Sequence, residues 1–403
     1  MYDYIIIGAG IVGLATAYAI QNNYPQANLL ILEKEKEAAH HQTGHNSGVI
    51  HSGVYYRPGS LKARFAKEGG EKLRRFCTAN AIQFENCGKI IVATREEELA
   101  NLQALYERGI ENGLELTKLD ASTLHDYEPH VSGLGGIYVH TTGIVDYKQV
   151  AAGLVQTIRA HDNTILFNTE IKAIADSKDG VTVASEQASY SARFLINCGG
   201  LHCDQLARMA GINPGMKIVP FRGEYYELKA EKRHLVRNLI YPVPNPEFPF
   251  LGVHFTRLID GRILAGPNAV PGLKRESYKK TDFNIKEFMD TLTYPAFWKM
   301  GSKNLRFGIS EIIRSLSKKR FVASMQEMIP EINEDDVFRS HAGVRAQALT
   351  DDGLLADDFL MIHNAHTLHI LNAPSPAATA SFSIGEAICA EVPEPARLAP
   401  AQL

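Results

Sequence analysis

The first 33 residues constrain the fold of this chain most strongly. Residues 4–7 are an apolar, β-branched run that predicts a buried strand. The glycine motif G-x-G-x-x-G follows as Gly8-Ala9-Gly10-Ile11-Val12-Gly13, and residues 14–20 predict a helix of small and apolar residues. Residues 28–32 predict a second buried strand, which Glu33 ends 20 residues after Gly13. Strand, glycine turn, helix, strand and acid in this order indicate a dinucleotide-binding unit.

Each part of this motif has a physical role. Gly8 allows the tight turn, Gly10 lets the backbone approach a pyrophosphate, and Gly13 lets helix and strand pack closely. The free N–H groups at the helix N-terminus favour phosphate charge, and Glu33 can accept hydrogen bonds from a ribose diol. The alternative, a glycine turn in an ordinary α/β protein, does not account for the acid.

The bulk composition limits the remaining function classes. A chain of 403 residues is long enough for two or three domain-sized units, and its net charge of −3 gives no reason to expect a nucleic-acid partner. The motif begins at residue 8, no apolar run reaches membrane-spanning length, and the five cysteines lack C-x-x-C spacing. We therefore expect a cytoplasmic protein with reduced thiols.

Residues 40–57 form an unusual polar segment with three glycines and four histidines. Small residues permit close approach and their N–H groups can face a ligand, so we interpret the segment as a loop that lines the cofactor. A solvated loop is the alternative. A second strand–glycine–helix junction at residues 194–203 predicts that the nucleotide-binding unit resumes there.

The rest of the chain predicts a second domain and a late return to the first. Residues 217–270 contain short strand patterns broken by Pro242, Pro244, Pro246 and Pro249, which favours an antiparallel sheet. Residues 283–330 are predicted to be helical, and residues 299–320 carry seven basic residues and one acid. This basic stretch is either a solvated helical surface or an amphipathic surface for an anionic membrane.

The last segment favours a flavin over a nicotinamide. Residues 368–372 predict a strand, Ser375 a helix N-cap and Pro376 the first helical residue of a small-residue helix. A reduced flavin gains negative charge, which a second helix N-terminus stabilises, whereas a reduced nicotinamide is neutral.

Several long strings resemble one family of flavoenzymes. The fingerprint with Glu33-Lys34, the Gly199-Gly200 junction and the late helix resemble the glycine oxidase/D-amino-acid oxidase superfamily. Within it, residues 41–51, 220–225, 249–254, 343–348 and 372–379 resemble the L-2-hydroxyglutarate oxidase/dehydrogenase family of bacterial type. The resemblance covers residues 1 to about 392. It implies FAD-dependent oxidation of L-2-hydroxyglutarate to 2-oxoglutarate by hydride transfer from C2 to flavin N5, with membrane quinone or O2 as acceptor.

The expected architecture is a Rossmann-like α/β FAD-binding domain, discontinuous in sequence, and an antiparallel-sheet substrate domain of the D-amino-acid oxidase type. FAD-binding segments are predicted at residues 1–80, 141–215 and 336–392, substrate segments at 81–140 and 216–335, and a flexible tail at 393–403. The residues expected to contact FAD are Gly8, Gly10, Ile11, Val12, Gly13, Glu33, Lys34, Thr43, Gly44, Asn46, Ser47, Gly48, Val49, Ile171, Cys198, Gly199, Gly200, Asn372, Pro374, Ser375, Pro376, Ala377 and Ala378.

A base must take the hydroxyl proton of such a substrate, and a neutral imidazole suits this role. We favour His51 or His254, and expect His369 to orient the flavin or substrate. A structural role is the alternative for each histidine.

Two carboxylates of the substrate need polar partners. Arg345 is our choice for the C1 carboxylate, because a guanidinium binds a planar carboxylate through two hydrogen bonds, although an ion pair with Asp351 or Asp352 is the alternative. The group that binds the C5 carboxylate stays open between Arg57, Lys62, Arg257 and Tyr225.

A metal site, an amine oxidase and a non-catalytic flavin sensor are the remaining alternatives. The three-residue spacing of His363, His366 and His369 suggests a metal, but a strand is predicted there and no acid or cysteine completes a site, so we expect none. An amine oxidase of the same superfamily would need an apolar side-chain pocket and no second carboxylate clamp. A non-catalytic flavin sensor would have no use for a cation beside the flavin.

Overall fold

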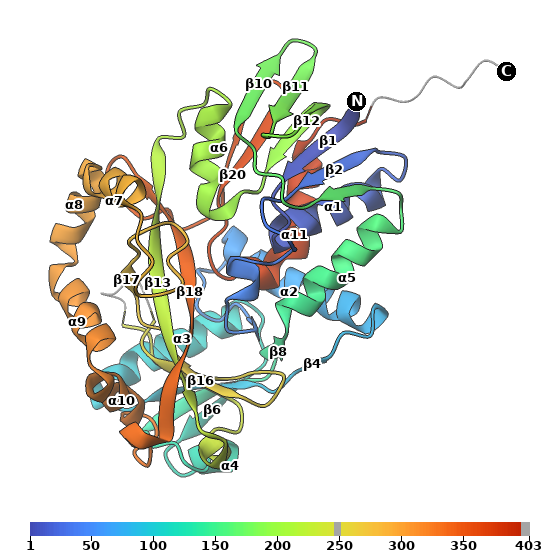
Figure 1. Ribbon diagram of the computed structural model, residues 1–403. Helices are drawn as coiled ribbons and strands as arrows, with labels where there is room; N and C mark the ends of the chain where they lie inside the picture. The colour runs from blue at the N-terminus through green and yellow to red at the C-terminus, as the bar shows by residue number, and fades with distance from the viewer. Residues whose placement is uncertain (246–250, 396–403) are drawn as a thin grey trace.

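The protein is described here by a computed structural model of residues 1–245 and 251–395. Two mainly β regions lie side by side, each covered by helices (Figure 1). Pro246, Pro249 and Phe250, and residues 396–403 of the expected tail, lie outside the described residues.

The first sheet carries the nucleotide-binding unit. Strands β20, β12, β1, β2 and β9 run parallel in that order, β10 and β11 extend it from β12, and β19 pairs antiparallel with β20. The strand bounds are β1 Tyr2–Ile7, β2 Leu29–Leu32, β9 Thr164–Leu166, β10 Ala173–Ser177, β11 Gly180–Ala184, β12 Ser189–Asn197, β19 Leu360–His363 and β20 Thr367–Asn372. The last four residues of β1 are buried, as a strand covered on both faces requires.

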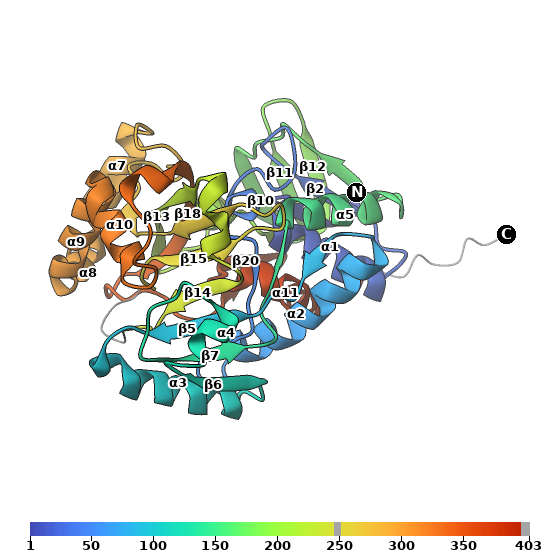
Figure 2. The ribbon, with the colours of Figure 1, turned by 90° about the horizontal axis from the view of Figure 1, so that it is seen from below.

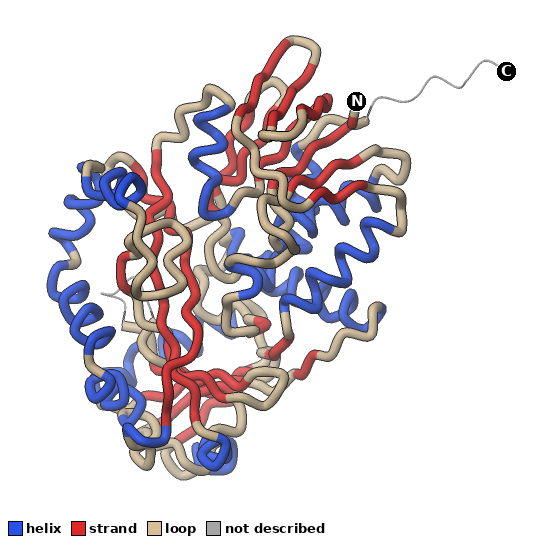
Figure 3. Tube along the Cα trace, viewed as in Figure 1, coloured by secondary structure: helices blue, strands red, loops and turns tan. Residues whose placement is uncertain are grey.

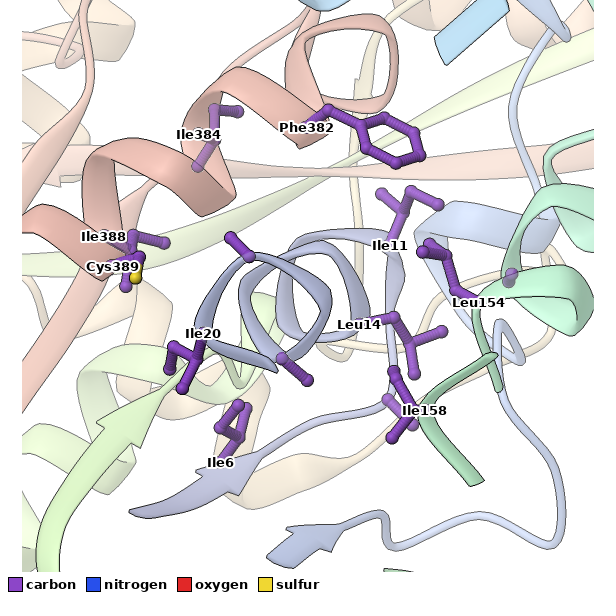
Figure 4. Close-up of a cluster of buried hydrophobic side chains, with 14 of the residues drawn as sticks. Ile6, Ile11, Leu14, Ile20, Leu154, Ile158, Phe382, Ile384, Ile388 and Cys389 are labelled. Carbon is purple, nitrogen blue, oxygen red and sulfur yellow. The ribbon is translucent and has the colours of Figure 1, made fainter. Parts of the chain in front are cut away.

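Helices cover this sheet on both faces. They are α1 Ile11–Asn23, α2 Leu61–Ala79, α5 Tyr147–Arg159, α6 Cys203–Met209 and α11 Ala377–Glu391. Figure 4 shows α1 between β1 and α11, with Ile6 below it, Ile384 and Ile388 above it and Leu154 of α5 beside it. Small residues bring the helices close: a Cβ at Gly385 would lie 2.4 Å from the carbonyl oxygen of Ala15.

The second sheet follows the order β17-β13-β16-β15-β14-β5-β7-β6, with β18 paired to β13. Its strands are β5 Lys89–Ala93, β6 Leu116–Asp120, β7 Gly135–Val139, β13 Met216–Leu228, β14 Leu239–Pro242, β15 His254–Arg257, β16 Ile263–Gly266, β17 Val270–Pro271 and β18 Val337–Thr350. A small third sheet consists of β3 Val49–Ile50, β8 Gly143–Val145 and β4 Phe84–Glu85.

Helices also cover the second sheet. The bounds are α3 Leu99–Glu111, α4 Leu124–Tyr127, α7 Ile285–Leu292, α8 Pro295–Lys303, α9 Leu305–Leu316 and α10 Lys318–Gln326. In Figures 1 and 2 the orange helices α7–α10 lie on the outer side of β13 and β18, whereas α3 lies under β5, β6 and β7. Figure 3 shows the long β13–β18 pair in red between the outer helices and the first domain.

Three sequence-based expectations need correction. Residues 337–350 were assigned to the last FAD-binding segment, but β18 pairs with β13 from Val337 to Thr350 in the second sheet; a strand's hydrophobic pattern does not reveal its partner. The second sheet is mixed, because β5 and β14 pair in parallel. The N-cap of α11 is Pro376, one residue after the predicted Ser375. The remaining domain boundaries stay predictions.

Candidate active site

A cavity of about 1240 Å³ lies where the two sheets meet. Its wall combines the N-terminus of α1, the loop at residues 42–60, the Cys198–Gly200 turn, β13 and β18, and residues 355–358 and 370–379. This volume exceeds the usual range for a small-molecule pocket, which fits an extended cofactor together with a substrate.

The glycine turn has the geometry that the fingerprint requires. Gly8 has a φ of +107°, and a Cβ there would lie 2.6 Å from the carbonyl oxygen of Cys198. A Cβ at Gly13 would lie 2.0 Å from the carbonyl oxygen of Gly8. Gly10, by contrast, lines the cavity, and the first turn of α1 carries no acidic residue and no side-chain cap. The N-terminus of α1 is therefore open to a phosphate.

Glu33 and Lys34 follow β2 beside this turn. The Glu33 carboxylate is buried and accepts hydrogen bonds from the Ala9 N–H at 2.7 Å and the Glu35 N–H at 3.0 Å. A carboxylate has further lone pairs, so these bonds leave acceptor capacity for a ribose hydroxyl. Lys34 bonds to Glu276 and forms an ion pair with Glu35 at 3.4 Å.

The loop after β2 is held by its own polar residues. Thr43 Oγ1 accepts a hydrogen bond from the Ile11 N–H at 2.9 Å, which ties the loop to α1. Asn46 donates to the Thr43 carbonyl oxygen and accepts from the Gly48 N–H, both at 2.8 Å. Thr43, Asn46, Ser47 and Val49 line the cavity, as a cofactor loop should, while Gly44 and Gly48 shape its backbone.

A second helix N-terminus faces the same cavity. Pro374, Ser375, Pro376, Ala377 and Ala378 line it, and α11 has neither a side-chain cap nor an acid in its first turn. Cys198 and Gly200 also line the wall.

Two histidines and an arginine lie at the substrate end of this cavity. His51, His254 and Arg345 all line it. His254 Nδ1 is 2.8 Å from the Gly252 carbonyl oxygen, so Nδ1 carries the proton and Nε2 is left as an acceptor. Arg345 Nη1 donates to the Asn268 carbonyl oxygen at 3.3 Å, rather than to Asp351 or Asp352.

Burial makes both histidines neutral. It lowers the pKa of His51 and of His254 to about 3, with help from nearby positive charge: Lys89 acts on both, and Arg345 acts on His254. Both imidazoles therefore carry a free lone pair at neutral pH. A bound dianion would raise these pKa values toward the range useful for proton transfer.

The other predicted substrate residues divide into two groups. Tyr225, Arg57 and Lys62 line the cavity, with Lys62 paired to Asp357 at 2.8 Å. Arg257 instead forms an ion pair with Glu85 and lies outside the lining.

Three predicted residues lie behind the cavity wall. His369 is a fully buried residue of β20 opposite Asn197 of β12, and its Nδ1 is 3.0 Å from Asn197 Nδ2. Asn197 in turn accepts from the Gly199 N–H, so His369 supports the turn rather than contacting a substrate. Ile171 and Asn372 are buried and do not line the cavity.

Several lining residues were missed by the sequence analysis. Thr379 accepts a hydrogen bond from the His51 N–H at 3.0 Å, and Gln42 accepts from the Ala346 N–H at 3.2 Å. Tyr55, Tyr56 and Tyr241 also line the cavity. The Tyr55-Tyr56 pair stands inside the polar loop, and two aromatic residues there were the available signal.

The three histidines that are spaced by three residues do not form a cluster. His363 pairs with Glu391 at 3.4 Å and His366 with Asp176 at 2.8 Å, while His369 is in the sheet. Among the described residues, Glu35, His41 and Glu276 place potential ligand atoms close together. The Lys34 ammonium already forms ion pairs with both carboxylates, so this cluster does not require a metal.

The residues present fit FAD. The N-termini of α1 and α11, neither capped by the side chain of its N-cap residue, line one large cavity. The glycine turn that a Cβ would fill adjoins it, and the buried Glu33 bonds to Ala9 beside Gly10 in the cavity wall. These features define a dinucleotide site beside a neutral imidazole and a guanidinium, as in an oxidoreductase. The chain belongs to the FAD-dependent oxidoreductase family, whose model matches residues 3–391.

Relatives within this family share most of the chain. A protein of Indibacter alkaliphilus named L-2-hydroxyglutarate dehydrogenase is 47% identical over 390 residues, covering 96% of this chain and 98% of its own. The protein of that name from Escherichia coli K12 is 45% identical over 393 residues, covering 97% of this chain and 93% of its own.

Solved structures confirm the fold class. L-alpha-glycerophosphate oxidase from Mycoplasma pneumoniae has a TM-score of 0.80 at 22% identity and covers 97% of this chain and 95% of its own. Glycine oxidase from Geobacillus kaustophilus has a TM-score of 0.70 at 18% identity, covering 95% and 92%. The predicted FAD-binding domain with a second-sheet domain is thus confirmed. Among the described helices, none is long and apolar enough to cross a membrane.

Proposed function

We propose that this protein oxidises the 2-hydroxyl group of L-2-hydroxyglutarate to give 2-oxoglutarate. The observation that carries the proposal is the shared cavity of His254 and Arg345, a neutral base and a carboxylate-binding cation beside the FAD site. The names and the extended identity of the relatives support the same substrate. FAD, when bound, supplies the acceptor for the hydride that leaves C2.

The chain's own residues then have separate tasks. Arg345 binds the C1 carboxylate through its planar fork and orients C2. His254 accepts the hydroxyl proton at Nε2, because the Gly252 carbonyl oxygen holds its proton on Nδ1. The imidazolium that forms is stabilised by the carboxylates of the substrate. The N-terminus of α11 faces the cavity and favours negative charge on the reduced cofactor.

The visible flavin spectrum tests this assignment. The purified FAD-loaded protein is mixed anaerobically with L-2-hydroxyglutarate, its D-enantiomer, L-lactate, glycerol 3-phosphate or glycine. We expect bleaching by L-2-hydroxyglutarate alone. Bleaching by glycine would assign the protein to the amine oxidases, and a fully loaded flavin that none of the five compounds bleaches would refute the proposal.

We further propose that the electrons pass to a quinone and that the protein docks on a membrane surface through α8 and α9. Trp298, Leu305 and Leu316 expose 59%, 61% and 74% of their surface on these helices. Glu311, the one acid of residues 299–320, is buried and accepts from the Ala269 N–H at 2.7 Å. The outward surface thus combines exposed apolar side chains with basic ones, which suits an anionic lipid surface.

Vesicle sedimentation tests the docking surface. We expect the protein to pellet with vesicles containing anionic lipid at low salt, and to be released by high salt because electrostatic attraction is screened. Leu316→Glu should reduce pelleting, whereas Leu134→Glu, at an exposed leucine elsewhere, should not. Protein that stays in the supernatant at low salt would refute docking. Faster reoxidation of the reduced enzyme by a soluble quinone than by O2 would support the quinone acceptor.

A further inference from the structure

A lysine without a counter-ion is buried beside the active-site cavity. Lys89 begins β5 and is 1% exposed. In the part of the chain that the structure describes, no hydrogen bond or ion pair is found for its Nζ. A charged ammonium in such a place is costly unless something compensates it.

Only aromatic faces partly compensate this charge among the described residues. Lys89 Nζ lies 4.4 Å from the centre of the Tyr55 ring and 4.9 Å from that of Tyr241. Both tyrosines line the cavity, and Lys89, which is not itself a lining residue, lies against their rings. Cation–π contact stabilises an ammonium but leaves its three N–H donors without acceptors.

A second donor at the same place also lacks a partner. The Tyr55 hydroxyl is buried without a hydrogen-bond partner within the described residues. The Tyr241 hydroxyl is likewise buried without a hydrogen-bond partner within the described residues. An ammonium and a phenol at one end of a cavity, both lacking acceptors, are complementary to an anionic oxygen ligand.

The charged groups near His254 indicate which kind of anion would bind. Both Arg345 and Lys89 act electrostatically on His254, so the base lies within reach of two cations, and the ring of Tyr241 lies 4.0 Å from that of His254. A 2-hydroxy dicarboxylate has its carbinol between two carboxylates. With Arg345 assigned to the C1 carboxylate and His254 to the hydroxyl, Lys89 is the second cation that acts on the base and is available for the distal carboxylate.

We propose that Lys89, with the Tyr55 hydroxyl, binds the distal carboxylate of the substrate and makes the site selective for dicarboxylates. This inference rests on the proposed function. It adds Lys89 to the open choice between Arg57, Lys62, Arg257 and Tyr225, of which Arg257 is paired with Glu85 and Lys62 with Asp357.

The test compares two substrates of equal chain length. L-2-hydroxypentanoate has a methyl group where L-2-hydroxyglutarate has its distal carboxylate. In Lys89→Met we expect the ratio of kcat/KM for the dicarboxylate to that for the monocarboxylate to fall about 100-fold, the effect of losing charge-assisted hydrogen bonds. The monocarboxylate should keep its wild-type kcat/KM or exceed it. Lys118→Met, an exposed lysine of β6, is the matched control and should keep the wild-type ratio.

Binding of glutarate, which cannot be oxidised at C2, gives a second measurement. Titration calorimetry on the FAD-loaded protein should show at least a tenfold loss of glutarate affinity in Lys89→Met. Flavin content and melting temperature verify folding, and Lys89→Gln replaces Lys89→Met if the latter does not fold.

Each outcome decides the inference. A Lys89→Met ratio within threefold of wild type, or a collapse of the ratio in Lys62→Met instead, would overturn it. If wild type is not reduced by L-2-hydroxyglutarate, the proposed function fails, while lost glutarate binding in Lys89→Met would still support a dicarboxylate subsite.

Discussion

The two ends of the active-site cavity differ in how completely their polar groups are satisfied. At the cofactor end, Thr43, Asn46 and Glu33 all bond to backbone groups of the adjacent loops. At the substrate end, Lys89 and the Tyr55 hydroxyl have no such partner among the described residues, and His254 keeps a free Nε2. The first end is organised before any ligand arrives. The second end is completed by the ligand itself, so variants at the two ends should fail differently.

The largest effect should come from the cofactor end. In Gly13→Ala the new Cβ would lie 2.0 Å from the Gly8 carbonyl oxygen, and helix and turn cannot both keep their positions. We expect FAD content to fall at least tenfold, measured as the ratio of flavin to protein absorbance. Normal FAD content in this variant would mean that the turn can adjust to the new Cβ. The cofactor end would then not be rigid before FAD binds.

The base at the substrate end should affect the chemical step. In His254→Gln the proton acceptor is lost, so we expect kcat to fall about 10²- to 10⁴-fold while FAD content stays at the wild-type level. Anaerobic stopped-flow measurement of flavin bleaching gives the rate. A loss of FAD together with activity would contradict the separation of the two ends.

Arg345 should affect binding and orientation together. Arg345→Met removes the guanidinium fork, and we expect kcat/KM for L-2-hydroxyglutarate to fall about 100-fold or more. Arg345→Lys should recover only part of the loss, because an ammonium cannot form the paired bonds. Full recovery would argue that charge alone matters here.

The pH profile should report Lys89. Burial lowers its pKa to about 7, and its neighbours Tyr55, Tyr241, His51 and His254 do not titrate nearby, since burial raises the tyrosine pKa values and lowers both histidine values to about 3. Only the protonated ammonium binds a carboxylate. As pH rises above about 7, kcat/KM should therefore fall toward tenfold per unit for L-2-hydroxyglutarate but stay flat for L-2-hydroxypentanoate. Parallel profiles would contradict this assignment.

The smallest effect should come from a glycine outside both ends. A Cβ at Gly301 in α8 would meet nothing within 4 Å, so Gly301→Ala should leave FAD content and kcat/KM unchanged. Alanine has a higher helix propensity than glycine, so the substitution should stabilise the protein by up to about 1 kcal/mol. This would be seen as a slightly raised midpoint in denaturant unfolding. A loss of FAD here would show that the Gly13 result is not specific.

The same contrast explains what the sequence could predict. The turn at Gly8–Gly13 and Glu33 lie within 26 consecutive residues, so their spacing alone carries the geometry. Lys89 and Tyr241 are far apart in sequence and meet through the parallel pairing of β5 with β14. No local sequence pattern predicts this strand pairing. For the same reason the sequence places residues 337–350 in the last FAD-binding segment, although β18 pairs with β13 in the second sheet. Nor does it reveal that Arg257 pairs with Glu85 or that His369 lies beside Asn197.

The parts of the cofactor site are synthesised at different times. Its wall begins with Gly10 in the first turn of α1 and is completed by Thr379 in α11, near the end of the described chain. The parallel partner of β12, β20, likewise comes late. During synthesis the N-terminal βαβ unit leaves the ribosome long before α11 exists, so a complete FAD site cannot form on the growing chain. Cofactor loading then follows the packing of α11 against α1.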